Sequence, residues 1–277
     1  MEYSLIYPVK EGYLRPELIT SVATAAEEAG FHSFLMWDHY LLPSGPDTLD
    51  AWAALAYVAG ITSTIKLGTV VTPIPFRPPA QLAKVVATVD ILSGGRTILG
   101  VGAGWHKPEF DGFSQWDGDG VRVDRTIEAL DLMTRLWTGE PVDFKGRFYS
   151  AEGAQIVPRP VQRPHPPLWF GVKGRRMMEL TARHGDVWIP TKIEPDEYRR
   201  GMERLRTLRN GMGIQGEVKG ALQQFDLFTD PDDFLRSINE YAGAGCGYYG
   251  AIWSYPPDEM VPRIGWFARE VKPHGPD

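Results

Sequence analysis

Cysteine is almost absent from this chain of 277 residues. The single cysteine, Cys246, has no partner for an internal disulfide and no second thiol for a thiolate metal cluster. It lies in an Ala-Gly-Cys-Gly segment just before an expected strand, so we interpret it as a small packed side chain rather than a nucleophile. The scarcity of thiols indicates a reduced setting, and we expect a cytoplasmic protein.

Long apolar runs and runs of positive charge are missing too. No stretch of 18 consecutive apolar residues occurs, so no helix is expected to span a membrane. Residues 1–8 lack the charged region, apolar stretch and cleavage site of a signal peptide. The net charge is −6 and no Lys or Arg run is long enough to follow a phosphate backbone, which argues against nucleic acid or anionic membrane as a partner.

Three common catalytic signatures are absent as well. No Gly-x-Gly-x-x-Gly follows the first expected strand, which disfavours a dinucleotide-binding sheet. No Gly-x-Ser-x-Gly supports a serine nucleophile, and no His-Glu-x-x-His or similar spacing supports a metal site. His39 and His106 lie too far apart in the sequence to argue for one, so no metal ligands are assigned.

What the sequence does contain is a regular alternation of short apolar runs and amphipathic segments. The expected strands cover residues 2–9, 34–37, 66–72, 96–102, 168–172, 187–190, 218–224 and 248–253. The expected helices cover residues 16–29, 51–62, 79–92, 124–137, 175–184, 195–209, 231–242 and 258–271. In the third helix the 3.6-residue period places on one face Leu82, Val85, Val86, Val89 and Leu92.

Strand–helix alternation predicts a parallel sheet, and eight such units predict an α/β fold closed into a (β/α)8 TIM barrel. We expect one domain over residues 1–277, since no linker or low-complexity segment interrupts the pattern. Residues 142–150, with a Lys-Gly turn, predict a small hairpin inserted after strand four, and the proline-rich residues 157–167 predict extended surface chain. An open doubly wound sheet is the alternative.

The C-terminal ends of the strands carry the site in barrels of this kind. Titratable, aromatic and glycine residues gather at several of these ends, namely residues 37–39, 100–106, 171–176 and 253–255, with Glu109 close behind. The cluster predicts a pocket for a flat ligand with an anionic tail. Trp37, Trp105, Trp169 and Trp253 are candidates for its apolar walls, with ordinary core packing as the alternative.

Individual residues in this cluster have both a functional and a structural interpretation. The turn from Lys173 to Arg176 opens a helix whose free N–H groups suit a phosphate, or it is a helix start with solvated arginines. His39 beside Asp38 is a candidate base with a carboxylate neighbour, or a histidine that only satisfies its own hydrogen bonds. Glu109 is a candidate general acid, or a solvated surface charge.

Five sequence blocks together resemble the luciferase-like monooxygenase superfamily. They are residues 29–39, 67–73, 94–105, 167–171 and 182–188, and they occur in the expected order over most of residues 1–190. The resemblance implies a barrel that binds FMN or the deazaflavin coenzyme F420 at its C-terminal face. The Asp-His pair after the second strand resembles the F420-dependent branch.

The resemblance also implies roles for particular residues. His39 and Glu109 match proton-transfer groups of the F420-dependent branch. The residues matched to cofactor contacts are Asp38, Val70, Val71, Gly102, Ala103, Gly104, Val172, Lys173, Gly174 and Arg175. The peptide bond between Val70 and Val71 is expected to be cis. The turn Val-Lys-Gly departs from the Gly-Gly or Gly-Ser that the family often has there.

The expected activity is therefore hydride transfer between coenzyme F420 and a small organic substrate, such as an alcohol, a sugar phosphate or an enone. An FMN-dependent monooxygenase is the alternative within the family, and a non-catalytic flavin-binding carrier is the alternative from another class. A metal-dependent or sugar-phosphate hydrolase on the same barrel is a third. The sequence leaves open the substrate, the reaction direction and whether the chain forms a homodimer.

Overall fold

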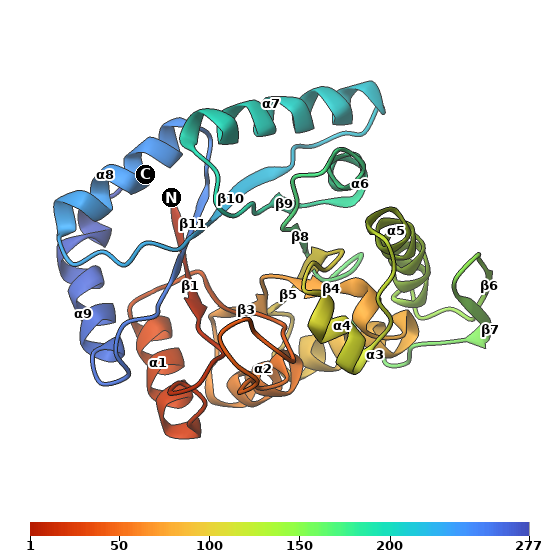
Figure 1. Cartoon of the computed structure of the whole chain (residues 1–277), viewed down its shortest axis with the longest axis horizontal. Coiled ribbons are helices and arrows are strands. Elements are labelled where there is room, and N and C mark those ends of the chain that lie inside the picture. Colours follow the sequence, from red (N-terminus) through yellow and green to blue (C-terminus); the bar gives the residue numbers. More distant parts are fainter. Residues whose placement is uncertain (277) are drawn as a thin grey trace.

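The computed structural model describes residues 1–276, and it shows a closed parallel barrel surrounded by helices (Figure 1). In spatial order the barrel contains β1 (Glu2–Tyr7), β2 (Ser33–Met36), β3 (Lys66–Thr69), β5 (Thr97–Gly102), β8 (Leu168–Phe170), β9 (Val187–Trp188), β10 (Lys219–Gln224) and β11 (Tyr248–Ile252). β11 pairs with β1 in parallel and closes the ring. The predicted (β/α)8 TIM barrel is confirmed.

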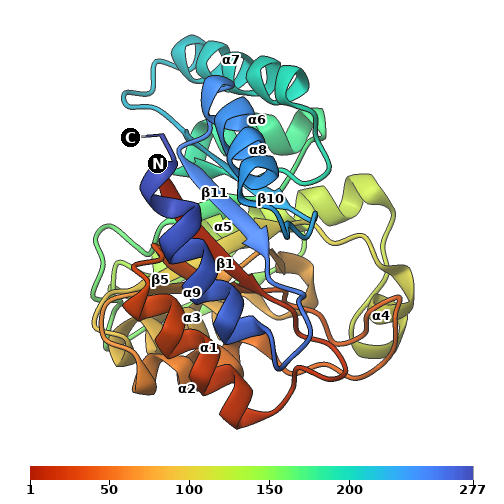
Figure 2. The ribbon, with the colours of Figure 1, turned by 90° about the vertical axis from the view of Figure 1, so that its left-hand side faces the viewer.

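Each barrel strand is followed by a helix on the outside. These are α1 (Pro16–Glu28), α2 (Ala51–Ile61), α3 (Pro79–Leu92), α5 (Asp119–Leu136), α6 (Arg175–His184), α7 (Pro195–Gly211), α8 (Pro231–Gly243) and α9 (Met260–Glu270), with 3₁₀ turns at Ile74–Phe76 and Lys272–His274. Four of them begin on a proline, whose fixed φ and missing N–H suit the first helical position. Figure 2 shows α1 and α9 side by side, outside β1 and β11.

The third barrel strand differs from the continuous strand expected over residues 66–72. It stops at Thr69 and resumes as β4 (Thr72–Pro73), which pairs with β5. The peptide bond between Val70 and Val71, at this break, is cis, as the family resemblance implies. The two valines therefore lie between two short strand segments at the C-terminal end of the barrel.

The inward face of α3 is rotated relative to the prediction. Leu82, Val86 and Val89 are buried as expected, but Val85 is 37% and Leu92 61% exposed. The buried stripe also contains Ala83, Ala87 and Asp90, so its centre lies further round the helix than the large aliphatic residues alone indicate. Small and polar residues that pack inward carry no hydrophobic signal in the sequence, which explains the error.

The longest connection of the barrel leads from β5 to β8. It contains the predicted hairpin, formed by β6 (Val142–Lys145) and β7 (Ser150–Ala154), which lies at the edge of the molecule beyond α5 (Figure 1). It also contains a helix that the sequence analysis does not predict, α4 (Lys107–Phe113). This short helix brings Glu109 to the C-terminal face of the barrel.

The barrel interior is filled by one apolar cluster of buried side chains from its strands. The cluster consists of Ile6, Leu35, Val70, Ile98, Trp169, Val187, Ile189, Ala221 and Ile252. Trp169 thus packs inside the barrel, and Trp253 packs outside it with its indole N–H donating to Met260 O. Both tryptophans serve packing, so the alternative interpretation holds for these two.

Cys246 is buried between the sheet and the outer helices. Its thiol donates to Tyr248 O at 3.3 Å, and burial raises the pKa of the thiol to about 12. A thiol that stays protonated at neutral pH is a poor nucleophile, which agrees with the interpretation as a packed side chain. Among residues 1–276, no helix combines the length and the apolar character that crossing a membrane requires.

Glu27, near the end of α1, fixes the loop that leads from α2 into β3. Its Oε1 accepts hydrogen bonds from the backbone N–H groups of Ser63, Thr64 and Ile65 at 2.6–3.0 Å. Partial burial alone would raise the pKa of this carboxyl, but the N–H donors outweigh it and lower the pKa from 4.5 to about 2. The loop therefore depends on an ionised Glu27.

Replacing Glu27 with glutamine is expected to lower the free energy of unfolding at pH 7 by about 1 kcal/mol, since solvent screens a half-exposed carboxylate. Because the folded pKa lies below the unfolded one, the carboxylate's contribution is complete above pH 4.5 and disappears as the pH falls toward about 2. Urea denaturation of both chains at several pH values should show their difference shrinking over this window. A difference that stays constant would contradict the assignment.

Candidate active site

A cavity of about 400 Å³ opens at the C-terminal end of the barrel strands. Its volume is in the range of about 300–1,000 Å³ that is usual for small-molecule sites. The residues that line it are Trp37, His39, Leu42, Pro43, Val70, Val71, Pro73, Gly102, Ala103, Gly104, Trp105, Gly171, Thr191, Gln223 and Phe225. They lie at the ends of six different barrel strands or in the segments that follow them, so the barrel itself positions this cavity.

One wall of the cavity is formed by Val71 between two glycines of neighbouring strands. A Cβ added at Gly102 would come within 2.5 Å of Val71 Cγ2, and one at Gly171 within 2.7 Å of Val71 Cγ1. Any side chain at either position would therefore displace Val71. The two glycines therefore leave the space that the Val71 side chain occupies in this wall.

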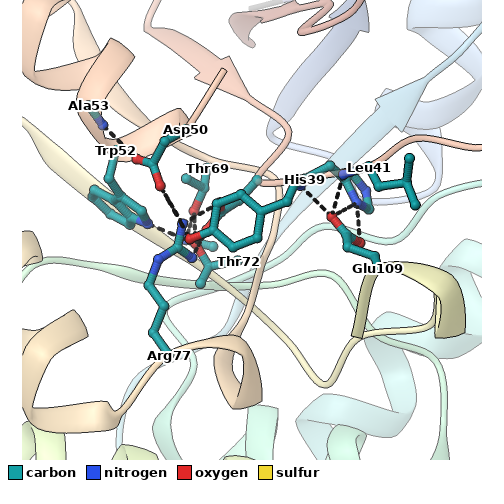
Figure 3. A network of polar contacts seen from close by, with 12 residues as sticks. His39, Leu41, Asp50, Trp52, Ala53, Thr69, Thr72, Arg77 and Glu109 are labelled. Atoms are coloured by element: carbon teal, nitrogen blue, oxygen red, sulfur yellow. Dashed lines mark hydrogen bonds and ion pairs between the residues drawn. The ribbon is translucent and has the colours of Figure 1, made fainter. Parts of the chain in front are cut away.

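His39 forms its closest polar contact with Glu109 and not with its sequence neighbour Asp38. The His39 Nδ1 lies 2.9 Å from Glu109 Oε2, and the Glu109 side chain is only 1% exposed (Figure 3). Glu109 also accepts hydrogen bonds from the backbone N–H groups of Tyr40 and Leu41. Glu109 is thus a buried carboxylate held by three donors, and it does not itself line the cavity.

This arrangement indicates which nitrogen of the neutral His39 ring carries the proton. Because an ionised Glu109 has only acceptors to offer, the hydrogen bond requires the proton on Nδ1 of His39. In the neutral ring the other nitrogen, Nε2, then carries a lone pair. Since Nδ1 faces Glu109 and the ring lines the cavity, Nε2 is the atom that can accept a proton from a bound molecule.

Asp38 belongs to a separate network behind His39. The carboxylate is fully buried and pairs with the two terminal nitrogens of Arg77 at 2.7 and 2.9 Å. The Thr72 hydroxyl donates to it at 2.8 Å, and Trp52 in turn donates to Thr72 (Figure 3). The sequence suggests Asp38 as the carboxylate neighbour of His39, but Arg77 draws it away from the cavity.

Arg77 connects this network to the start of α2. It also pairs with Asp50, the N-cap residue of α2, at 2.9 Å, and lies over the ring of Tyr40 at 4.9 Å. Burial alone would lower the pKa of the Arg77 guanidinium, but the charge of Asp38 and the hydrogen bonds to it raise the pKa above its usual value. The loop that carries His39 is therefore held by Arg77 on one side and by Glu109 on the other.

The turn after β8 contributes only Gly171 to the cavity wall. Val172, Lys173, Gly174 and Arg175 follow directly, and none of them lines the cavity. Gly174 is the N-cap of α6 and provides no side-chain cap, so the first N–H groups of α6 lack a capping side chain. Arg175 is exposed and pairs with Glu179 at 3.1 Å, within its own helix.

Several residues near the site are not among the candidates taken from the sequence. Thr191, Gln223 and Phe225 line the cavity, and Arg77 holds Asp38. Gln223 lies in the seventh barrel strand, and Thr191 and Phe225 follow the sixth and seventh strands, so these three belong to the same pattern of strand ends that predicts the other site residues. Thr191 Oγ1 is buried without a hydrogen-bond partner among residues 1–276, and it is therefore free to bind a ligand in the cavity.

One curated relative is about one-third identical in sequence to part of this chain. The F420-dependent hydroxymycolic acid dehydrogenase of Mycobacterium tuberculosis is 34% identical over 179 residues. The match covers 63% of this chain and 49% of the relative, so the chain spans about half the length of the curated relative it matches.

Solved structures with the same fold differ in their cofactor. An F420-dependent secondary alcohol dehydrogenase, in complex with an F420–acetone adduct, superposes with a TM-score of 0.83 at 20% identity, covering 98% of this chain and 99% of the other. The FMN-bound oxygenating constituent of 3,6-diketocamphane monooxygenase from Pseudomonas putida superposes with a TM-score of 0.84 at 16% identity, covering 100% and 99%. At these identities the similarity concerns the fold. The family model described as luciferase-like monooxygenase matches residues 8–229, well over half of the chain, and the chain therefore belongs to that family.

Proposed function

We propose that this protein is an oxidoreductase that transfers a hydride between coenzyme F420 and a small organic substrate. The observation that carries the proposal is the His39–Glu109 pair, which leaves a proton-accepting nitrogen at the edge of a ring-sized cavity. The F420-dependent relative at 34% identity supports this cofactor. The continuous ring from β1 to β11 supports one functional domain over residues 1–277.

The residues present fit a flat cofactor with an anionic tail. Val70, Val71 and residues 102–104 would hold the ring, and the uncapped start of α6, from Val172 to Arg175, would hold the phosphate. The buried Thr191 hydroxyl is a free polar group for the ring edge. When bound, such a cofactor supplies two-electron hydride chemistry, which no side chain provides.

The chain's own contribution is to orient the substrate and to move its proton. In the direction of alcohol oxidation, His39 Nε2 accepts the proton of the substrate hydroxyl, and in the reverse direction it returns it. Glu109 holds the imidazole in the required tautomer and stabilises its protonated form. In this proposal Glu109 positions His39 and does not act on the substrate, and Asp38 supports the loop from behind the cofactor site.

Titration of the protein with F420 and, separately, with FMN tests the cofactor. We expect F420 to bind more tightly, and micromolar binding of FMN with no binding of F420 would overturn the proposal. The FMN-bound structure of the same fold makes an FMN-dependent monooxygenase the second candidate. A carrier protein would bind the cofactor stoichiometrically without any substrate-dependent change in its absorbance.

Replacing Arg175 with alanine is expected to raise the Kd of F420 about ten- to a hundredfold, the effect of one well-made charge-assisted hydrogen bond. The reason is that Arg175 begins α6, where the phosphate is proposed to bind. Arg183→Ala, in the last turn of the same helix, is the matched control and should leave the Kd unchanged. Fluorescence titration of both variants measures the effect, and equal affinities would place the phosphate elsewhere.

A further inference from the structure

We propose that Phe225 divides the mouth of the barrel into two chambers and reserves the one beside His39 for an uncharged, largely apolar alcohol or ketone. The inference rests on the function proposed above and narrows its substrate class. Phe225 follows β10 and lines both the cavity of about 400 Å³ that contains His39 and a second cavity of about 860 Å³. We call these the apolar chamber and the polar chamber.

Apart from His39, the apolar chamber has no group that could neutralise an anion, and a protonated His39 is already paired with Glu109. Of the residues that line it, all within the described chain, His39 is the only one with a titratable side chain. The other side chains are mainly Trp37, Leu42, Pro43, Trp105 and the two valines. A phosphate or carboxylate bound there would lose its water without gaining a cation, which is costly.

The polar chamber carries mostly negative charge. Its lining includes Glu194, Asp226, Asp233 and Glu240, against two cations, Lys192 and Arg236. Arg236 is already paired with Asp233 at 2.8 Å. Burial, together with the charges of Glu194, Asp226 and Glu240, raises the pKa of Tyr241 to about 12, as expected where carboxylates gather. An anionic substrate is therefore disfavoured in this chamber too.

Phe225 is placed to separate the two chambers. Its ring stacks on Trp37, which follows β2 on the other side of β1 and β11, with centroids 6.4 Å apart and planes 16° apart. On the side of the polar chamber, the Lys192 ammonium lies 5.6 Å from the Phe225 ring. The Phe225 side chain thus keeps both Lys192 and the acidic groups out of the chamber where the substrate meets His39.

The test compares cyclohexanol with glucose 6-phosphate as substrates for the whole protein with F420. We expect kcat/KM to favour cyclohexanol by more than about a hundredfold, the discrimination typical of a site that leaves a charged group unpaired. Phe225→Ala should lower kcat/KM for cyclohexanol about tenfold or more, through the apolar contact it loses, with an unchanged Kd for F420. The control is Leu227→Ala, an exposed residue that lines the polar chamber alone and should change kcat/KM less than twofold.

A second measurement needs no cofactor. Trp37 and Trp105 line the apolar chamber, so the intrinsic fluorescence of the protein reports binding of cyclohexanone or of glucose 6-phosphate. Tighter binding of cyclohexanone to the parent chain, weakened in Phe225→Ala, supports the two chambers even if F420 itself fails to bind, a result that would refute only the proposed function. Equal or tighter binding of glucose 6-phosphate, or turnover of it at the rate of cyclohexanol, overturns the inference.

Discussion

A His39→Ala variant should turn over the proposed alcohol substrate about 10²–10⁴-fold more slowly than the parent chain, the usual contribution of a general base. The Kd of the cofactor should change little, because His39 is one of many residues around the cavity and its proposed role is to accept the substrate proton. Stopped-flow absorbance under single-turnover conditions separates the two quantities. Unchanged turnover on an accepted substrate would remove His39 from the mechanism.

Glu109→Gln tests whether Glu109 sets the tautomer of His39. The backbone N–H groups of Tyr40 and Leu41 would keep the amide oxygen facing them, which leaves the amide NH₂ facing His39. The imidazole must then accept at Nδ1 and carry its proton on Nε2, which is the wrong tautomer for a base. We expect a loss of turnover close to that of His39→Ala, and wild-type turnover would show that Glu109 does not set the tautomer.

Arg77→Met should lower the free energy of unfolding by about 3–5 kcal/mol, the usual result when a buried ion pair loses one partner. The reason is that Asp38 is fully buried and would lose the guanidinium with which it is paired. Urea denaturation followed by circular dichroism measures the change.

Two further chains control this experiment. Arg135→Met makes the same replacement at an arginine whose ion pair with Asp131 is exposed. It should lower the free energy of unfolding by less than about 1 kcal/mol. The double replacement Arg77→Met with Asp38→Asn removes both buried charges and should recover part of the lost stability. If Arg77→Met lowers the free energy of unfolding no more than Arg135→Met does, the buried network does not stabilise the fold.

The fold was predictable because most of its elements have strong local signals. The bounds of α3 and α6 agree with those expected, since proline, glycine and histidine mark their ends. The short helix α4 was not predictable in the same way. It has only seven residues, with a proline and a glycine among them, so neither its period nor its composition differs from a loop.

The site was predictable only in part, because its decisive contacts are long-range. The resemblance pointed to both His39 and Glu109, but nothing in the sequence joins two residues that lie 70 positions apart. Likewise, Asp38 follows a buried strand beside His39, and its true partner Arg77 is 39 positions away. Strand-end patterns locate such residues at one end of the barrel, whereas only the folded chain decides which side chains meet.

The backbone amides of Tyr40 and Leu41 both donate to Glu109, so their hydrogen exchange reports whether the site is assembled. These amides belong to the loop after β2, and their acceptor belongs to α4, in the connection after β5. Whenever α4 separates from the loop, the two amides lose their acceptor and His39 loses its orientation in the same event. Their rates of exchange with deuterated solvent therefore measure the fraction of molecules in which His39 has lost its contact with Glu109. In the mechanism proposed above, local opening of this seven-residue helix would therefore interrupt proton transfer while the barrel stays intact.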